Sequence, residues 1–344
     1  MRPHATLLGY NLNLPSYRNR MRSLVGALEA AGWSVQLEQF PSGRYGLRTW
    51  ERRELLRRSD VVVLHQIKLS AAEAWLFSSL TRRRVFDFDD AIYVRKPRRL
   101  GEPAGDSRWR RKKFAATCRS VDVVAAGNDV LARVARPAAR RVVTLPTALD
   151  ISAYRATSAT QADPPTIAWV GSPENLVYLE LMRPALARLA QRHPRLRLRV
   201  ICSRFPDWPE VEIEPVVWSP TTEIEALAGS HIGVMPLTDD EWTRGKCAFK
   251  LLQYMAASLP CVASPVGANT EAVLEDKTGY YARNAEEWEN ALERLIRSAE
   301  LRARLGAAGR AHVESRYSVQ VYQARYLELF NGLLTGAPGS AASR

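Results

Sequence analysis

Two adjoining stretches in the second half of the chain carry the clearest pattern: WTRGKCAFKLLQYMA, residues 242–256, and LPCVASPVGAN, residues 259–269. In the first stretch, Lys246, Lys250 and Gln253 stand at positions i, i+4 and i+7. This spacing predicts a helix with these three side chains on one face and an apolar face opposite. The second stretch reads as a short buried strand, residues 260–263, followed by a glycine-containing loop. Together the two stretches predict one helix-strand unit of a parallel sheet.

Strand-like runs alternate with helix-length amphipathic segments along the whole chain. The expected strands span residues 6–10, 33–40, 61–64, 84–88, 121–126 and 142–145 in the first half, and residues 166–170, 198–202, 211–217, 232–235 and 260–263 in the second. An amphipathic helix is expected over residues 15–31. The alternation predicts an α/β protein with two Rossmann-like, doubly wound parallel-sheet domains that face a central crevice, where ligands of open sheets bind.

The domain boundary is expected in residues 151–165, which are mostly small or polar and end in two prolines that exclude a helix. This linker separates an N-terminal domain, residues 1–150, from a C-terminal domain, residues 166–317. The last helix, residues 318–335, has an apolar face that must pack on another element, and we expect it to cross back to the first domain. Residues 336–344 are expected to form a disordered tail.

Length and composition are those of a soluble two-domain protein. The 344 residues are 46% apolar and 25% charged, and no apolar run reaches the roughly 18 to 20 residues needed to cross a bilayer. The first residues lack the apolar core of a secretory signal, so a cytoplasmic location is expected. The four cysteines are scattered without a C-x-x-C spacing, which indicates buried thiols and neither metal ligands nor disulfides.

The positive charge is confined to the first half of the chain. Residues 1–150 hold 28 Lys and Arg against 14 Asp and Glu, net +14, whereas residues 151–344 hold 21 against 22, net −1. A basic surface attracts an anionic membrane, a phosphate-bearing acceptor or nucleic acid. Because 42 of the 49 basic residues are Arg, a compositional bias explains the surplus equally well. Nucleic-acid binding ranks third among the functions considered, since no aromatic-interleaved basic motif accompanies the charge.

The segment 242–269 resembles the donor-site signature of the family 4 glycosyltransferases, or glycosyl transferases group 1. The similarity continues from Glu271 to the start of the last helix. Residues 146–150 and 168–172 resemble the end of the family's first domain and the first strand of its second. The resemblance implies the GT-B fold, a nucleotide-diphosphate sugar as co-substrate without a further cofactor, no metal requirement and retention of anomeric configuration.

Two departures from the family pattern concern the donor site. The family frames this helix with two glutamates, and Gly245 and Gln253 stand at their positions. A glutamine keeps one acceptor oxygen for the donor ribose but loses the charge. The basic pair that grips the diphosphate in the family is also missing, because residues 171–175, with Ser172 and Asn175 as donor-site candidates, offer no cation.

We therefore expect Lys246 and Lys250 to neutralise the donor diphosphate, together with the free N–H groups at the start of the predicted helix. The alternatives are pairing of the lysines with the acidic residues 239–241, or a solvated charged face.

The loop with Gly267 and Asn269 follows a strand, which lets its backbone amides approach a phosphate or sugar hydroxyls. A simple helix cap is the alternative for this loop. The resemblance places Glu271 beside the donor.

On the acceptor side, Asp87, Asp89 and Asp90 end a predicted strand, with Phe88 between them. Phe88 is expected to point inward and the carboxylates outward to the rim of the crevice. An acidic surface loop is the alternative. The resemblance places Asp89 near the family's acceptor-site histidine. Asp89 and Asp90 then act either as general base for the acceptor hydroxyl or as orienting groups while the departing phosphate takes the proton.

Three further first-domain residues are candidates for acceptor or phosphate binding. His65 follows another predicted strand, and Arg18 and Arg20 stand where guanidinium groups can fork onto phosphate oxygens. A structural histidine and exposed arginines are the alternatives. A magnesium site at the Asp cluster ranks low because the cluster lies in the domain opposite the expected diphosphate, so no metal site is predicted.

The sequence thus predicts a glycosyltransferase that moves a sugar from a nucleotide-diphosphate sugar to a glycan, lipid-linked or small-molecule acceptor. Peripheral contact with an anionic membrane on the cytoplasmic face is part of this interpretation, and no nucleic-acid partner is expected. The alternative is a catalytically weak GT-B binding module or partner subunit, which the two missing glutamates suggest.

Overall fold

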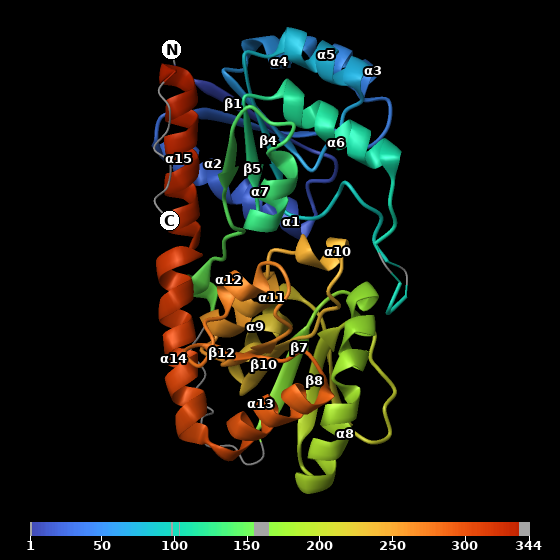
Figure 1. Ribbon diagram of the computed structural model, residues 1–344. Coiled ribbons are helices and arrows are strands. Elements are labelled where there is room, and N and C mark those ends of the chain that lie inside the picture. Colours follow the sequence, from blue (N-terminus) through green and yellow to red (C-terminus); the bar gives the residue numbers. More distant parts are fainter. Residues whose placement is uncertain (1, 98, 103, 155–164, 337–344) are drawn as a thin grey trace.

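The computed structural model describes residues 2–97, 99–102, 104–154 and 165–336. In this part of the chain, two six-stranded parallel sheets lie one above the other, each flanked by helices (Figure 1). The predicted α/β class with two doubly wound sheets is confirmed. The predictions for most of the linker and for the tail fall on residues 155–164 and 337–344, which lie outside the described residues.

The first sheet has the order β2-β1-β3-β4-β5-β6. Its strands are β1 (His4–Gly9), β2 (Ser34–Gln39), β3 (Val61–His65), β4 (Arg83–Phe88), β5 (Val123–Ala126) and β6 (Val142–Thr144). β3 is buried along its whole length because helices cover both faces of a parallel sheet. The register pairs His65, the last residue of β3, with Asp87 of β4, which brings both to the carboxyl end of the sheet.

The second sheet has the order β12-β11-β10-β7-β8-β9. Its strands are β7 (Thr166–Val170), β8 (Arg197–Cys202), β9 (Glu212–Val217), β10 (Ile232–Met235), β11 (Cys261–Ala263) and β12 (Gly279–Tyr281). The edge strand β12 was not predicted, because three residues are too few to show a pattern. Gly279 begins it, and a Cβ there would lie 2.0 Å from the carbonyl oxygen of Cys261 on β11.

Helices of the first domain are α1 (Pro15–Arg20), α2 (Val25–Ala30), α3 (Tyr45–Glu51), α4 (Arg53–Arg58), α5 (Ala71–Leu80), α6 (Arg108–Ser120) and α7 (Asp129–Ala135). The single helix predicted over residues 15–31 is wrong, since a 3₁₀ turn, Arg22–Leu24, separates α1 from α2. The Ser23 hydroxyl donates to the carbonyl of Asn19 (2.7 Å), a local bond that competes with regular helix.

Helices of the second domain are η3 (Pro173–Leu181, 3₁₀), α8 (Arg183–Arg192), α9 (Pro220–Ala228), α10 (Glu241–Arg244), α11 (Phe249–Ala256), α12 (Asn269–Ala272), α13 (Ala285–Arg297) and α14 (Ala299–Arg316). Residues 245–248 separate α10 from α11, and Ala248 has a left-handed φ of 55°, which interrupts the helix. Lys246 therefore lies outside α11. The predicted common helix face for Lys246, Lys250 and Gln253 is wrong.

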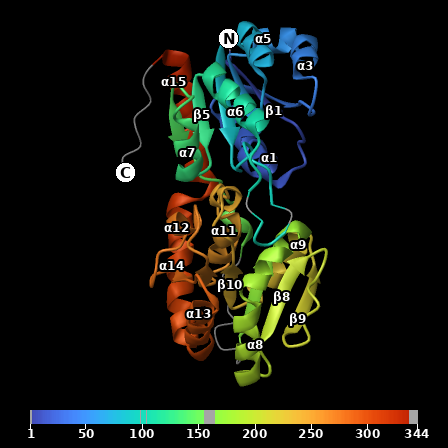
Figure 2. The same cartoon turned by 45° about the vertical axis from the view of Figure 1, so that its right-hand side comes forward.

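The C-terminal helices connect the two domains. α14 runs along the second domain and α15 (Val319–Thr335) along the first, as both views show (Figures 1 and 2). Tyr322, Tyr326 and Phe330 of α15 are buried in the core beneath the first sheet. The expected return of the last helix to the first domain is observed.

Phe330→Ala measures how much α15 contributes to the first domain. The ring is fully buried, with its centre 5.2 Å from that of Trp33. Removing a core phenylalanine costs about 3 to 5 kcal/mol, so the free energy of unfolding in urea should fall by that amount. Gln320→Ala, an exposed change on the same helix, should stay within about 0.5 kcal/mol of the wild type. Equal stabilities of the two variants would contradict the core assignment.

Candidate active site

A cavity of about 170 Å³ lies between the two domains. The first domain lines it with Pro15, Ser16, Asn19, Asp89, Asp90 and Thr147, and the second with Met235, Lys246, Cys247, Ala248, Phe249 and Lys250. The charged lining is therefore acidic on the first-domain side and basic on the second-domain side. The sequence placed acceptor and donor groups on these same two sides.

The turn at residues 245–248 docks on the first domain. The Cys247 thiol donates to the backbone carbonyl of Asp89 (3.2 Å). A Cβ on Gly245 would lie only 2.6 Å from the Cβ of Ala91. Gly245, which the resemblance aligns with the first glutamate of the family pattern, is thus required by a close contact between the domains and does not itself line the cavity.

Lys246 and Lys250 bring positive charge to the cavity. The Lys250 ammonium lies 4.3 Å from the centre of the Trp169 ring, and the Lys246 ammonium is 3.4 Å from the side-chain oxygen of Asn175. Burial in the first place, and then the neighbouring Lys246 charge, hold the pKa of Lys250 well below its usual value. A buried ammonium in this setting favours an anionic ligand.

The acidic residues 239–241 have other partners. Asp239 pairs with Arg244 (2.6 Å), Asp240 caps α10, and Glu241 pairs with Arg111 of the first domain (2.7 Å). Within the described residues no hydrogen bond or ion pair joins them to the cavity lysines. The alternative in which these carboxylates neutralise the lysines is therefore not supported.

Two further residues shape the basic side. A Cβ on Gly171 would lie 2.7 Å from the Lys250 ammonium, so a side chain at this position would clash with that group. Lys96 of the first domain is close enough that its charge also lowers the pKa of Lys250. Burial, followed by the charge of Lys246, lowers the pKa of Lys96 itself. The sequence analysis missed Lys96, because no local pattern shows that its loop folds toward the lysines of the other domain.

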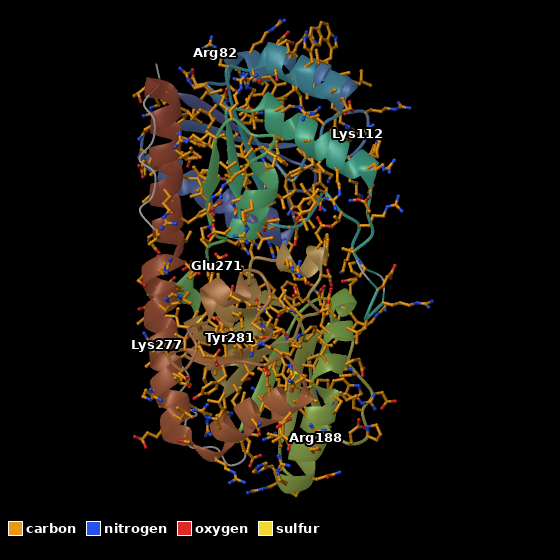
Figure 3. All side chains as sticks on the ribbon, viewed as in Figure 1. Arg82, Lys112, Arg188, Glu271, Lys277 and Tyr281 are labelled. Carbon is orange, nitrogen blue, oxygen red and sulfur yellow. The ribbon has the colours of Figure 1, made fainter. Side chains whose placement is uncertain are left out.

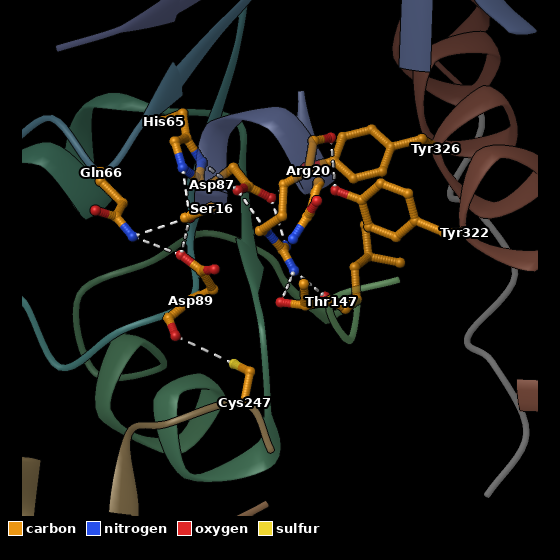
Figure 4. A network of polar contacts seen from close by, with 12 residues as sticks. Ser16, Arg20, His65, Gln66, Asp87, Asp89, Thr147, Cys247, Tyr322 and Tyr326 are labelled. Atoms are coloured by element: carbon orange, nitrogen blue, oxygen red, sulfur yellow. Dashed lines mark hydrogen bonds and ion pairs between the residues drawn. The ribbon is translucent and has the colours of Figure 1, made fainter. Parts of the chain in front are cut away.

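Asp87 is the centre of a buried polar cluster (Figure 4). Its carboxylate accepts two hydrogen bonds from Arg20 (2.8 and 2.6 Å), one from the Tyr326 hydroxyl, and lies 2.7 Å from Nδ1 of His65. Burial alone would raise the pKa of Asp87, but the charge and hydrogen bonds of Arg20, together with the contact to His65, outweigh it and hold that pKa well below its usual range. Asp87 and Arg20 are both fully buried. The predictions that Asp87 meets the acceptor and Arg20 a phosphate are therefore wrong.

The misplacement of Asp87 has a simple structural cause. Successive side chains of a strand point to opposite faces of its sheet. Phe88 packs on Phe114 of α6, with ring centres 5.1 Å apart, and Asp87 faces α1 and α15 on the other side. Because helices cover both faces of this parallel sheet, neither direction leads to the rim of the crevice.

A chain of hydrogen bonds links Asp87 to the cavity (Figure 4). Nε2 of His65 lies 2.8 Å from the Ser16 hydroxyl oxygen, and Ser16 donates to Oδ1 of Asp89 (2.6 Å). Gln66 donates to the same oxygen. His65 is only 2% exposed, so it orients Ser16 and does not reach a ligand. The sequence analysis did not single out Ser16. The available signal was its place at the start of α1, directly after the loop that follows the first strand.

Asp89 and Asp90 line the cavity, at the position that the sequence predicted for them. Burial, followed by the neighbouring Asp89 charge, raises the pKa of Asp90 to about 7 against the opposing charges of Lys246 and Lys96. Near neutral pH, Asp90 therefore exists both as an acid that donates and as a carboxylate that accepts. Oδ1 of Asp89 is occupied by Ser16 and Gln66. The catalytic role of the two residues stays a prediction.

Gln253 is buried and does not line the cavity. It is 5% exposed, and its amide donates to the Tyr154 hydroxyl (3.1 Å) and to Glu223. Glu223 also accepts from the indole of Trp218 (2.6 Å). A carboxylate from α9 thus lies directly beside Gln253, which the resemblance aligns with the second glutamate of the family pattern. Glu223 was missed because it lies about 30 residues earlier, in a segment without a recognisable motif.

The remaining donor candidates do not line the cavity. Asn269 is buried and donates to the carbonyl of Ser264 (2.9 Å), and a Cβ on Gly267 would lie 2.4 Å from the carbonyl oxygen of Arg244. Glu271 lies at the junction of the domains (Figure 3), close enough to Asp129 of α7 that the two charges interact.

Ser172 and Arg18 lie at the edge of the site. Asn175, which contacts Lys246, also donates to the Ser172 hydroxyl (2.9 Å). Arg18 is exposed on α1, and its charge acts on Glu223 of the second domain. Among the described residues, no group of three or more His, Cys, Asp or Glu side chains is arranged to hold a metal ion. In the same residues, no helix is both long and apolar enough to cross a membrane.

Comparison with known proteins gives one family match. Residues 164–298 match the family model for glycosyl transferases group 1. The matched segment contains the lysine side of the cavity. A search of curated proteins gives no match.

Several solved structures share the fold of nearly the whole chain. Sucrose-phosphate synthase from Thermosynechococcus elongatus aligns with a TM-score of 0.73 at 13% identity, over 97% of this chain and 100% of that one. A glycosyltransferase from Rickettsia africae gives 0.74 at 12% identity, over 97% and 99%. Anabaena HepE in complex with UDP-glucose gives 0.69 at 11% identity, over 96% and 99%. These likenesses show the fold, and the GT-B prediction is confirmed.

Asp90→Asn should change how stability depends on pH. The pKa of Asp90 in the folded state, about 7, lies above the value of about 3.9 in an unfolded chain. The folded protein therefore holds one more proton between these limits, and wild-type stability falls as pH rises from about 4 to about 7. Urea unfolding at a series of pH values should show the variant gaining stability over the wild type across this window, with no gain below it. A constant difference at all pH values would contradict the raised pKa.

Proposed function

We propose that the protein transfers a sugar from a nucleotide-diphosphate sugar to a hydroxyl group of a glycan, lipid-linked or small-molecule acceptor. The observation that carries this proposal is the polarity of the cavity, with lysines on one side and carboxylates on the other. The match of residues 164–298 and the UDP-glucose complex of Anabaena HepE support a nucleotide-sugar donor. We further propose that the reaction is metal-independent, retains anomeric configuration and takes place in the cytoplasm.

On the donor side, the diphosphate would lie between Lys246, Lys250 and Lys96. Besides burial, the charge of Lys246 lowers the pKa of both Lys250 and Lys96, and the charge of Lys96 lowers that of Lys250, so the three ammonium groups disfavour one another. A diphosphate relieves that repulsion, because each ammonium gains an anionic partner. Since the pKa of free Lys250 is lowered, diphosphate binding draws a proton onto it, and the affinity falls as pH rises.

On the acceptor side, Asp89 is the group placed to receive a proton. Ser16 and Gln66 hold its Oδ1, and Oδ2 is the oxygen assigned to the acceptor hydroxyl. In the proposed step the acceptor O–H bond breaks, its oxygen bonds to the anomeric carbon, and the bond from that carbon to the diphosphate breaks. The proton passes to Asp89 or to the departing phosphate, and Asp90 orients the acceptor.

A catalytically weak nucleotide-sugar-binding module is the second candidate. The observation that favours it is the replacement of both family glutamates, by Gly245 in a domain contact and by the buried Gln253. The two candidates differ in one measurable respect: such a module binds the nucleotide sugar but releases no sugar to an acceptor.

Replacement of the cavity lysines tests the donor side. A charge-assisted hydrogen bond to phosphate contributes about 1.5 to 3 kcal/mol, so Lys250→Ala or Lys246→Ala should weaken nucleoside-diphosphate binding by about 10-fold to 150-fold. Binding of the corresponding nucleoside should not change, and calorimetry measures both. Lys277→Ala, an exposed lysine of the same domain, serves as the matched control. Wild-type diphosphate affinity in both cavity variants would show that the phosphates bind elsewhere.

Asp89→Asn tests the acceptor side. Loss of a positioned acid-base group lowers the rate by about 10²-fold or more, so sugar transfer should fall by this factor while nucleotide affinity stays the same. Asp207→Asn, an exposed change in the second domain, should leave transfer unaltered. Full activity of Asp89→Asn would show that this carboxylate takes no part in the reaction. A wild type that binds nucleotide sugar but transfers no sugar would support the binding module.

A further inference from the structure

We propose that the outer surface of α3, α5 and α6 binds an anionic membrane. We call this surface the tryptophan face and define it by Trp50, Trp75 and Trp109, one from each helix. Their side chains are 52%, 73% and 65% exposed. No other tryptophan among the described residues is more than half exposed. Large aromatic side chains left in water on three neighbouring helices mark an interaction surface.

The three helices form one continuous surface. Lys113 of α6 contacts the other two helices. Its ammonium pairs with Glu73 of α5 (3.3 Å) and lies 5.9 Å from the ring centre of Tyr45 on α3. The helices stand at the top of the molecule and along its front in Figure 1, on the side of the first domain away from α15. The tryptophan face is therefore uncovered by other elements of the described chain.

Cations surround the tryptophans. Residues 44–58 hold six arginines against two glutamates, and residues 108–113 hold five cations and no acidic residue. Two of these cations lie against the exposed rings: the Lys113 ammonium is 4.4 Å from the ring centre of Trp109, and the Arg53 guanidinium carbon is 5.1 Å from that of Trp50. Lys112 projects from the outer side of α6 (Figure 3). Much of the charge surplus of the first half thus lies in α3, α4 and the start of α6, close in sequence to Trp50 and Trp109.

This combination fits the headgroup region of an anionic bilayer. Indole rings prefer the boundary between water and hydrocarbon, and flanking Arg and Lys side chains reach the lipid phosphates. Each cation near an anionic surface adds to binding, and the indoles add a contribution that salt does not screen. A surface formed by the outer sides of helices suits a flat partner, which favours a bilayer over a small ligand.

The tryptophan face leads to the proposed active site. Arg111 of α6 donates two hydrogen bonds to the carboxylate of Glu241 on α10 (3.0 and 2.7 Å). α10 directly precedes the turn that carries Lys246. Resting on the proposed function, this arrangement indicates that the acceptor is carried by a membrane lipid and enters the cavity from the α6 side.

Flotation with vesicles tests the tryptophan face without any nucleotide. The wild type should bind vesicles of phosphatidylcholine and phosphatidylserine at low salt, and bind pure phosphatidylcholine far more weakly. The vesicle-water partition coefficient of the triple variant Trp50→Ala/Trp75→Ala/Trp109→Ala should fall by about 100-fold or more. Each exposed indole is expected to contribute at least about 5-fold to this coefficient. Its circular-dichroism spectrum and unfolding should match the wild type, since the three side chains are exposed.

A charge variant separates electrostatic attraction to the anionic lipids from insertion of the indole rings into the bilayer. Arg108→Glu/Lys112→Glu should lose about 25-fold or more, about 5-fold for each cation removed, and the residual binding should depend less on salt. Arg195→Glu/Arg304→Glu makes the same charge change on exposed residues of the second domain and should retain wild-type partitioning.

Three results would overturn the proposal. The first is a wild type that does not float with anionic vesicles at low salt, and the second is equal flotation of the wild type and the tryptophan variant. The third is a wild type that is dimeric without vesicles and a tryptophan variant that is monomeric, since the face would then be a protein interface. Vesicle binding together with failed sugar transfer would contradict the proposed function and the lipid-linked acceptor that rests on it, and would leave the membrane-binding surface supported.

Discussion

The buried ion pair between Asp87 and Arg20 is the interaction on which the first domain and its half of the site depend. Two charges that are buried away from water are tolerated only when they are paired and hydrogen-bonded. The hydrogen bonds of Asp87 on β4 come from Arg20 of α1 and Tyr326 of α15, so all three elements must be in place to form them. The same carboxylate fixes His65, which orients Ser16 and through it Asp89. Folding of the C-terminal helix and orientation of a cavity carboxylate are thus coupled through one residue.

The second domain contributes the opposite kind of electrostatics. Lys246 and Lys250 have no ion pair within the described residues, and the acidic residues next to them in sequence are engaged elsewhere. A folded protein keeps unpaired, partly buried ammonium groups at a cost in stability, which a bound anion offsets. Burial also raises the pKa of Asp90, across the cavity, to about 7. The two sides therefore combine lysines without an ion pair with one carboxyl group, that of Asp90, which exchanges a proton near neutral pH.

Much of the architecture was predictable from the sequence, because period-two and period-3.6 patterns report which faces are buried. Strands such as 166–170 and the return of α15 were predicted in this way. The left-handed Ala248 leaves no such trace, so Lys246 was wrongly placed on a helix. Asp87 was misassigned because its burial depends on Arg20 and Tyr326, 67 and 239 residues away. Lys96 and Glu223 were missed for the same reason: only tertiary contacts bring them close to Lys250 and Gln253.

The proposed function requires the cavity to bind the diphosphate of a nucleotide sugar. The most direct test is thermal unfolding of the wild-type protein with a panel of nucleosides, nucleoside diphosphates and nucleotide-diphosphate sugars. A ligand at a hundred times its dissociation constant adds about 2.7 kcal/mol to the stability of the form that binds it. We expect the nucleoside diphosphate and the nucleotide-diphosphate sugar of at least one base to raise the melting temperature well above the effect of the nucleoside. If no nucleoside diphosphate or nucleotide sugar in a complete panel raises it, the cavity does not bind such a donor and the proposed function is contradicted.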